Sequence, residues 1–258
     1  MKSTDVVTIY NEDYFLKAVD GFSEFARFDG TYDLLFERYK RNIFLLDLKP
    51  EHKLLEIGCG RGEVCIYHSL NGGESKGVDY SSEAIELARR KAIALEASAV
   101  FFESSFDKLC EQESSYDRIL ASEFIEHISA QEGAVFFKMA YSLLKPGGKL
   151  LVYTMPNTLQ RRYGYPLTRL LAAFRGQRLP RRQDDTLSEH YKLYHLNEQN
   201  YFSLKNFAMQ AGFSKIVVGY DARHNRLSGR KNMWIRKFVE RIPLRHILFS
   251  NLYVVAEK

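Results

Sequence analysis

The sequence predicts an α/β fold in which a mostly parallel β-sheet carries helices on both faces. Apolar runs of strand length alternate with helical patterns between residues 53 and 155, as in repeated strand–helix–strand units. The 258 residues are enough for one large domain with a cap, and the 45% hydrophobic and 27% charged contents are ordinary for a globular chain. The N-terminal residues are aromatic-rich with helical patterns, so we expect a helical cap over residues 1–50 and a main domain over residues 51–258.

Seven segments have the apolar, β-branched or aromatic character of strands. The first five alternate with helices, and the last two follow a long basic interruption. In chain order they are residues 53–58 (KLLEIG), 75–80 (SKGVDY), 99–103 (AVFFE), 116–122 (YDRILAS), 149–155 (KLLVYTM), 215–221 (KIVVGYD) and 251–257 (NLYVVAE).

The helices between the strands have recognisable ends. One begins near Gly62, a second is capped by Ser81 or Ser82, and a third covers AQEGAVFFKMAYSLLK before the turn KPGG. A later helix, in the stretch LNEQNYFSLKNFAMQAGF, ends at Gly212. This order of elements places a helix after each of the first, second and fourth strands.

The net charge of +5 is concentrated in two insertions, residues 157–190 and residues 222–249. Residues 161–183 carry seven arginines and no acid, and residues 222–246 carry eight lysines or arginines against one glutamate, so each stretch is +7. The rest of the chain is therefore −9. Both insertions place apolar residues at helical spacing among basic ones. That pattern suits an anionic membrane surface, a phosphate-bearing substrate or RNA, or a helix that covers the protein's own core.

The stretch LLEIGCGRGEV joins the first strand to the first helix. Ligands of open α/β sheets bind outside the carboxyl ends of the strands, where glycines let the backbone approach and the next helix presents free N–H groups. Nicotinamide and flavin sites use G-x-G-x-x-G, whereas here Gly58, Gly60 and Gly62 alternate and Glu56 precedes them. An acid at that place repels a pyrophosphate and attracts a cation, so the turn predicts a cationic small ligand and disfavours a dehydrogenase.

With this turn the sequence resembles the class I S-adenosylmethionine-dependent methyltransferases, whose first motif is an acid followed by G-x-G-x-G. The resemblance covers about residues 50 to 221 and the last strand. It implies a doubly wound, Rossmann-like, seven-stranded sheet with an antiparallel last strand. It also implies an enzyme that binds S-adenosylmethionine, whose methionine part carries an ammonium and a sulfonium, and releases S-adenosylhomocysteine.

The resemblance further implies which residues hold the cofactor. Asp79, at the end of the second strand, accepts hydrogen bonds from both ribose hydroxyls, with Tyr80 beside the adenine and Phe106 flanking the ring. Ser105 stands where family members often carry an acid that receives the adenine amino group. The full implied set is Glu56, Gly58, Cys59, Gly60, Asp79, Tyr80, Ser105, Phe106 and Ser122.

Glu123, Glu126 and His127 follow the fourth strand, at the edge where an acceptor would meet the methyl group. In one interpretation His127 and Glu123 are catalytic, with His127 as general base for an acceptor hydroxyl, because imidazole titrates near neutral pH. In a second, all three bind Mg²⁺ or Mn²⁺ with His190, similar to small-RNA 3′-end 2′-O-methyltransferases and ubiquinone-pathway O-methyltransferases. In a third they only begin a helix, with solvated acids and a packed histidine.

The layout of cap, glycine turn and two insertions is similar to that of methyltransferases of bacterial surface-polysaccharide and glycolipid synthesis. It implies O-methylation of a hydroxyl on a sugar, a lipid-linked acceptor or another small molecule. One alternative is a metal-dependent RNA 2′-O-methyltransferase, which the lack of an RNA-binding module and the few stacking aromatics disfavour. The other is a cofactor-binding regulator or scaffold without turnover.

Cys59, Cys65 and Cys110 show no metal-like pairing and form no complete disulfide set, which indicates reduced thiols and a cytoplasmic protein. No apolar run reaches the length of a membrane span, and no export signal is visible. We therefore expect a cytoplasmic protein that meets the inner membrane face through its basic insertions. We expect no nucleic-acid partner, and the sequence leaves the oligomeric state open.

Overall fold

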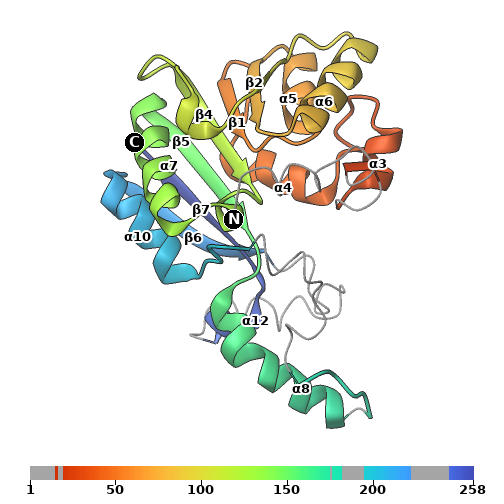
Figure 1. The fold of residues 1–258 in the computed structure, drawn as a ribbon, viewed down its shortest axis with the longest axis vertical. Helices are drawn as coiled ribbons and strands as arrows, with labels where there is room; N and C mark the ends of the chain where they lie inside the picture. The colour runs from red at the N-terminus through yellow and green to blue at the C-terminus, as the bar shows by residue number, and fades with distance from the viewer. Residues whose placement is uncertain (1–14, 17–19, 175, 182–194, 222–243) are drawn as a thin grey trace.

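The computed structural model describes residues 15–16, 20–174, 176–181, 195–221 and 244–258. These residues build a seven-stranded sheet with the strand order β3-β2-β1-β4-β5-β7-β6 (Figure 1). β7 runs antiparallel to both β5 and β6, and the other neighbouring pairs are parallel. The predicted α/β fold with an antiparallel last strand is confirmed. The strands are β1 Lys53–Ile57, β2 Glu74–Asp79, β3 Val100–Glu103, β4 Tyr116–Ser122, β5 Leu144–Thr154, β6 Lys215–Asp221 and β7 Asn251–Glu257.

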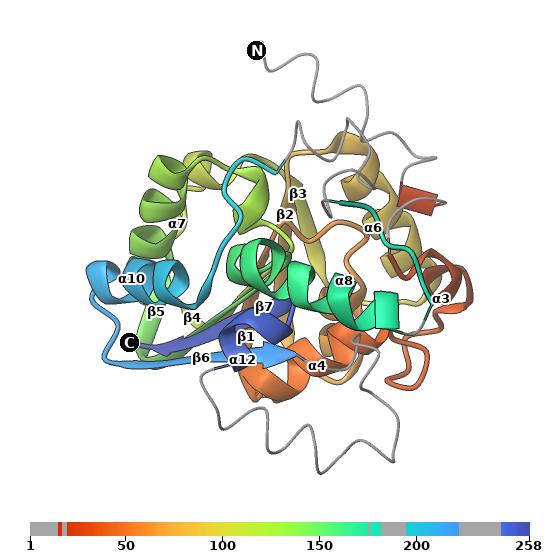
Figure 2. The ribbon, with the colours of Figure 1, turned by 90° about the horizontal axis from the view of Figure 1, so that it is seen from below.

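Helices cover both faces of the sheet (Figures 1 and 2). On one face lie α4 (Glu37–Leu46), α5 (Glu63–Leu70) and α6 (Ser82–Ala94), and on the other lie α7 (Ala130–Leu143) and α10 (Tyr201–Ala211). The shorter described elements are α3 Phe22–Arg27, α8 Tyr165–Phe174, α12 Arg245–Leu248, the 3₁₀ turns η1 Phe106–Lys108 and η2 Ile125–His127, and the π-helical turn η3 Gln160–Gly164.

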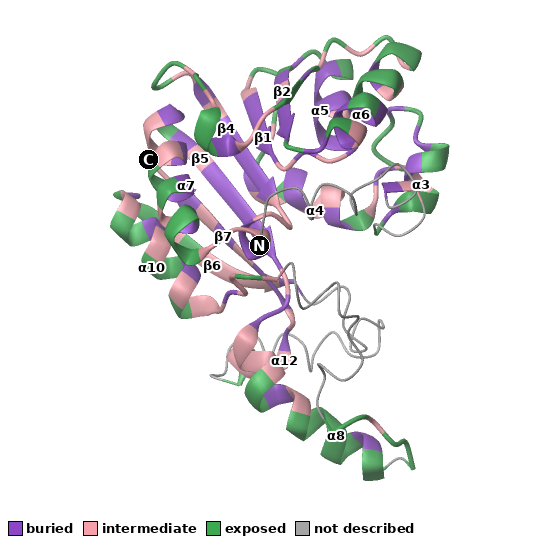
Figure 3. Ribbon diagram, in the orientation of Figure 1, coloured by how far each residue is buried: buried purple, intermediate pink, exposed green. Residues whose placement is uncertain are grey.

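The strands bury apolar side chains on both faces, because helices cover both (Figure 3). Leu54 and Leu120 pack in the cluster that includes α4, α5 and α6, whereas the next residue of β1, Leu55, packs in the cluster that includes α7 and α10. This alternation follows from the two-residue period of a strand. The two clusters form the core and leave the carboxyl ends of the strands free for polar groups.

Helix ends agree with their capping residues. The Ser81 side chain caps α6 by accepting a hydrogen bond from the Ala84 N–H (3.2 Å), and Gly212 ends α10 with φ 100°. The later helix begins at Tyr201, inside the expected stretch. Its start is set by Asn200, whose side chain accepts from the first free N–H groups of the helix.

The KPGG turn lies within β5 in the structure. Tyr116 of β4 pairs with Leu144, while Arg118 pairs with Lys149, so residues 145–148 bulge out of the register. Gly147 has φ 76°, and nothing lies near its missing side chain. The strand is therefore continuous on both sides of a turn that the sequence predicts as its boundary.

The described part of the N-terminal segment packs against the carboxyl ends of β1 and β4. Asn42 of α4 donates a hydrogen bond to the Ser122 hydroxyl (2.9 Å) at the end of β4. Arg61, in the glycine turn after β1, is buried and donates to the backbone oxygens of Phe15 (2.8 Å) and Asp20 (3.1 Å). These contacts place N-terminal residues where a ligand of this fold would bind.

The first basic insertion forms η3 and α8, and α8 projects away from the sheet (Figure 1). Residues 182–194, which include the end of this insertion, lie outside the described residues. The second insertion is described only over residues 244–249, so the predicted amphipathic segment around Trp234 also lies outside them. Among the helices that the structure describes, none has the length and apolar character of a membrane span.

Candidate active site

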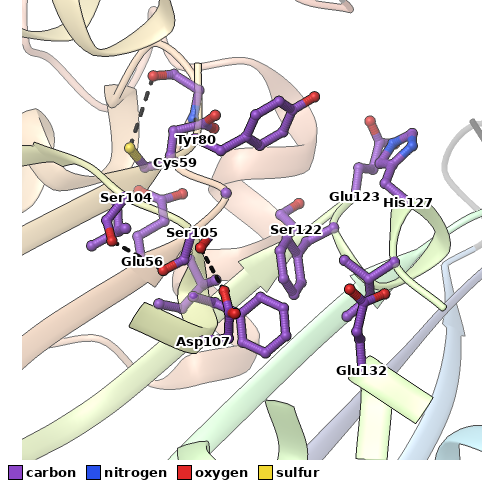
Figure 4. A pocket seen from close by; sticks show the side chains of 18 of the residues that line it. Glu56, Cys59, Tyr80, Ser104, Ser105, Asp107, Ser122, Glu123, His127 and Glu132 are labelled. Carbon is purple, nitrogen blue, oxygen red and sulfur yellow. Dashed lines mark hydrogen bonds between the residues drawn. The ribbon is translucent and has the colours of Figure 1, made fainter. Parts of the chain in front are cut away.

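A cavity of about 310 Å³ opens at the carboxyl ends of β1, β2 and β4, a volume typical of small-molecule sites. Figure 4 shows Glu56 and Cys59 on one side and Glu123 and His127 on the other. Phe15, Arg38 and Tyr39 contribute from the N-terminal segment, which sequence reasoning did not predict. All nine residues of the implied cofactor set line this cavity: Glu56, Gly58, Cys59, Gly60, Asp79, Tyr80, Ser105, Phe106 and Ser122.

The glycine turn needs glycine for two different reasons. Gly60 has φ 51°, and a Cβ there would have no atom within 4 Å, so the bare backbone faces open space beside the cavity. A Cβ on Gly62, with φ 75°, would instead lie 2.4 Å from the Phe101 ring. Gly60 therefore keeps the ligand side open, and Gly62 lets the turn pack on β3.

Asp79 and Glu56 are buried carboxyls in the cavity wall. The two Asp79 oxygens accept hydrogen bonds from the N–H groups of Gly60 (2.9 Å) and Ser81 (3.0 Å), which fixes the carboxylate between the first two motifs. Burial raises the pKa of Asp79. Burial also raises the pKa of Glu56 to about 8, even though the Cys65 thiol donates to it (3.2 Å). A cation in the cavity would favour the ionised form of both groups.

The residues after β3 supply an acid that the sequence prediction did not include. Ser105 lines the cavity and its hydroxyl donates to the Asp107 carboxylate (2.5 Å), which lines the cavity too. Phe106 is buried and packs edge-on against Phe124, with the ring centroids 5.5 Å apart. The cavity thus has a carboxylate at Asp107, two residues after Ser105, the position where the resemblance leads one to expect an acid.

Glu123 sits at the end of β4 in a strained backbone conformation. Its φ of 53° lies in the left-handed region, which for a residue other than glycine costs on the order of 1 kcal/mol or more. The buried Arg38 guanidinium donates to its carboxylate, and the Arg38 Nε is buried without a hydrogen-bond partner among the residues that the structure describes. Arg38 therefore fixes an ionised Glu123 at the cavity wall.

His127 ends the 3₁₀ turn η2 and lines the cavity. His195 is a later histidine beside it: the two rings meet edge to face with centroids 5.0 Å apart. His195 Nδ1 lies 3.4 Å from the Glu198 carboxylate, which in turn binds Arg161 (2.6 Å). His190 lies outside the described residues.

Residues 54–148 match the model of a methyltransferase domain family. Over 117 residues the chain is 35% identical to phosphoethanolamine N-methyltransferase 3 of Arabidopsis thaliana, covering 45% of this chain and 24% of that protein. Over 108 residues it is 32% identical to a ubiquinone biosynthesis O-methyltransferase of Chelativorans sp., covering 42% of each. The matched part spans less than half the length of these curated relatives.

Solved structures share the fold at lower identity. Phosphoethanolamine N-methyltransferase 2 of Haemonchus contortus, in complex with S-adenosyl-L-methionine, has a TM-score of 0.60 at 17% identity, covering 96% of this chain and 59% of that one. A SAM dependent methyltransferase from Archaeoglobus fulgidus has a TM-score of 0.54 at 19% identity, covering 93% and 100%. Together these matches support the class I S-adenosylmethionine-dependent methyltransferase superfamily, with residues 54–148 as the matched methyltransferase domain.

Within this methyltransferase fold, Glu126 does not join Glu123 and His127 at the cavity. Its side chain is buried and accepts a hydrogen bond from the Thr154 hydroxyl (2.8 Å), and burial raises its pKa to about 8. In the part of the chain that the structure describes, no three His, Cys, Asp or Glu side chains gather as metal ligands would. The arrangement of Glu123, Glu126 and His127 does not fit the proposed Mg²⁺ or Mn²⁺ site.

Proposed function

We propose that the protein transfers a methyl group from S-adenosylmethionine to a hydroxyl of a sugar, a glycolipid or another small acceptor, with His127 as general base. The observation that carries the proposal is the shared cavity. The acid–glycine turn and Asp79 line one part of it, and Glu123 and His127 line another. A cofactor held by the first part would therefore present its reactive end within the same enclosed space as a proton acceptor.

The cavity has the chemistry that S-adenosylmethionine requires. Its wall contains the carboxyls of Glu56, Asp79 and Asp107, and the open backbone at Gly60 leaves room for a ligand. Glu56 would face the ammonium, Asp79 the ribose, and Tyr80, which is 41% exposed, the adenine. When bound, the cofactor supplies an electrophilic methyl group, so the protein has to position the acceptor and remove its proton.

The second part of the cavity supplies that proton acceptor. His127 is held by η2, and His195 packs against its ring. A histidine can take a proton from a hydroxyl near neutral pH, and a base in this role contributes about 10²–10⁴-fold to the rate. Arg38 neutralises Glu123 beside His127 and holds the Glu123 carboxylate in place as the acceptor enters.

The second candidate is methylation of a small amine. The curated relatives include phosphoethanolamine N-methyltransferases as well as ubiquinone biosynthesis O-methyltransferases. The lining carboxylates Asp107 and Glu132 favour a positively charged acceptor. His127 has the same task in this case, because an ammonium must lose a proton before nitrogen attacks.

Calorimetry with S-adenosylmethionine, S-adenosylhomocysteine and NAD tests the cofactor. We expect the first two to bind and Asp79→Ala to weaken both by about 2 kcal/mol, as for two lost charge-assisted hydrogen bonds. NAD binding of equal or higher affinity would overturn the assignment. Panels of hydroxyl and amine acceptors, assayed for S-adenosylhomocysteine release, separate the two reactions. His127→Ala should lower turnover about 10²–10⁴-fold and leave cofactor affinity unchanged.

A further inference from the structure

α8 presents its apolar side chains away from the rest of the described chain. Leu167, Leu170, Leu171 and Phe174 recur at i, i+3, i+4 and i+7, so they lie along one side of the helix, and we call them the α8 stripe. Their exposed fractions are 37%, 55%, 50% and 80%. A stripe with this spacing normally faces the core of a globular protein, and an exposed one marks a contact surface.

The opposite side of α8 contacts the segment that directly follows the helix. The Tyr165 hydroxyl donates to the Pro180 backbone oxygen (3.1 Å), and the Arg169 guanidinium donates to the Arg181 backbone oxygen (3.1 Å). Ala172, on the same side, is the one buried residue of the helix. The side opposite the stripe thus carries the following segment, and most of α8 is exposed (Figure 3).

The surroundings of the stripe are basic. Residues 161–183 carry seven arginines and no acid, and Arg162, Arg178 and Arg181 are exposed. The Glu198 carboxylate binds Arg161, so its charge is already paired and does not offset the other arginines. An outward apolar stripe among arginines is the composition of a helix that lies in an anionic lipid interface, where the apolar side enters and the guanidinium groups meet headgroup anions.

We propose that the α8 stripe and its flanking arginines dock the protein onto an anionic lipid bilayer. A second copy of this chain is the less favourable occupant, because two such surfaces would bring arginine-rich stretches against each other. α8 leaves the sheet after β5, at the same edge where β4 ends beside Glu123, since these two strands are parallel neighbours. Docking through α8 would therefore hold the cavity near the bilayer. The inference does not depend on the reaction.

Co-sedimentation of the full chain with phosphatidylcholine vesicles, with and without phosphatidylglycerol, tests this. We expect binding only with phosphatidylglycerol, and weaker binding at high salt. The pair Leu170→Ser and Phe174→Ser should weaken binding at least about tenfold. Ile93→Ser, which alters an equally exposed apolar residue (77%) on α6, is the control and should change nothing.

A second pair of variants measures the charge. Arg178→Gln with Arg181→Gln should weaken binding by roughly fivefold for each arginine. Lys138→Gln with Lys205→Gln, on the exposed sides of α7 and α10, is the matched control and should stay within about twofold. Circular dichroism and cofactor calorimetry check that each variant is folded.

Three results would overturn the proposal. The first is no vesicle binding, and the second is equal, salt-insensitive binding to both vesicle types. The third is a concentration-dependent dimer in sedimentation velocity that the Leu170→Ser and Phe174→Ser pair abolishes, which would assign the stripe to a second copy. Because vesicle binding is measured without substrate, a failed methyl-transfer assay leaves this test unaffected.

Discussion

α7 and α8 carry apolar side chains at the same spacing and use them in opposite ways. In α7, Gly133, Phe136, Phe137 and Ala140 stand at i, i+3, i+4 and i+7, and all are buried against the sheet and α10. In α8 the four residues of the stripe have the same spacing and are all exposed. Equal periodicity therefore identifies the apolar side of a helix in both cases and does not decide what covers it.

Chain connectivity explains the difference. α7 links β4 to β5, which are parallel neighbours, so the crossover has to lie on the sheet and bury its apolar side there. α8 follows β5, and the next strand, β6, begins only at Lys215. No short crossover places α8 on the sheet, and its hydrogen bonds to residues 180–181, which closely follow it, lie on the side opposite the stripe.

The largest expected difference between the two helices is in stability. Phe136→Ala removes a fully buried ring and should lower the free energy of unfolding by about 3–5 kcal/mol. Phe174→Ala, on the 80% exposed residue of α8, should change it by no more than about 0.5 kcal/mol. Urea denaturation of both variants measures this, and a cost above about 2 kcal/mol for Phe174→Ala would mean that the stripe is covered within the folded chain.

A smaller effect is expected at the contacts between η3, which precedes α8, and η2, which precedes α7. Arg161, Glu198 and His195 connect η3 to the His127 ring. His195→Ala should lower kcat by on the order of tenfold without weakening cofactor binding, because the His127 ring loses its packing partner. His195→Phe keeps the ring and should restore most of the rate, whereas equal loss in both variants would assign the effect to the Glu198 contact.

Cofactor affinity should be independent of α7 and α8 and should depend on the protonation state of Glu56. In the ligand-free protein burial raises the pKa of Glu56 to about 8, so most molecules hold the proton at pH 7. A cationic ligand favours the ionised form, so binding should release close to one proton and tighten about tenfold from pH 6 to pH 7. Calorimetry in buffers of different ionisation enthalpy measures the proton. Glu56→Gln should flatten the dependence, and the Phe174→Ala protein should retain it.

The smallest expected effect is that of Glu126, just before α7. Because this side chain is bound to Thr154 inside the protein, Glu126→Gln should change kcat by no more than about twofold. Chelators should not change the turnover of the unmodified protein. Burial raises the pKa of Glu126 to about 8 in the folded protein, whereas the carboxyl of the unfolded chain titrates near 4.5. The free energy of unfolding should therefore fall as the pH rises from about 4.5 to about 8. Denaturation at several pH values should show that Glu126→Gln reduces this dependence of the free energy of unfolding on pH. Turnover that a chelator abolishes would instead support the metal site.

The local sequence determined the fold and one half of the cavity. The strand and helix patterns, the glycine turn and Asp79 are each read within about ten residues, and the parallel sheet then brings the ends of β1 and β2 together. The hydrogen bond from the Gly60 N–H to Asp79 is the outcome of that rule. His127 and Glu123 were found for the same reason, since β4 pairs with β1 and ends at the same edge.

Only the tertiary structure decided the contacts that join distant segments. Arg38 reaches Glu123 across 85 positions of sequence, and His195 packs against His127, although no local pattern identifies either partner. The Glu126 side chain is buried and bound to Thr154 of β5, whereas the α8 stripe is exposed on the side of the helix opposite Tyr165. Periodicity and motif spacing encode which side of an element is apolar or polar, but burial depends on what the rest of the chain places against that side.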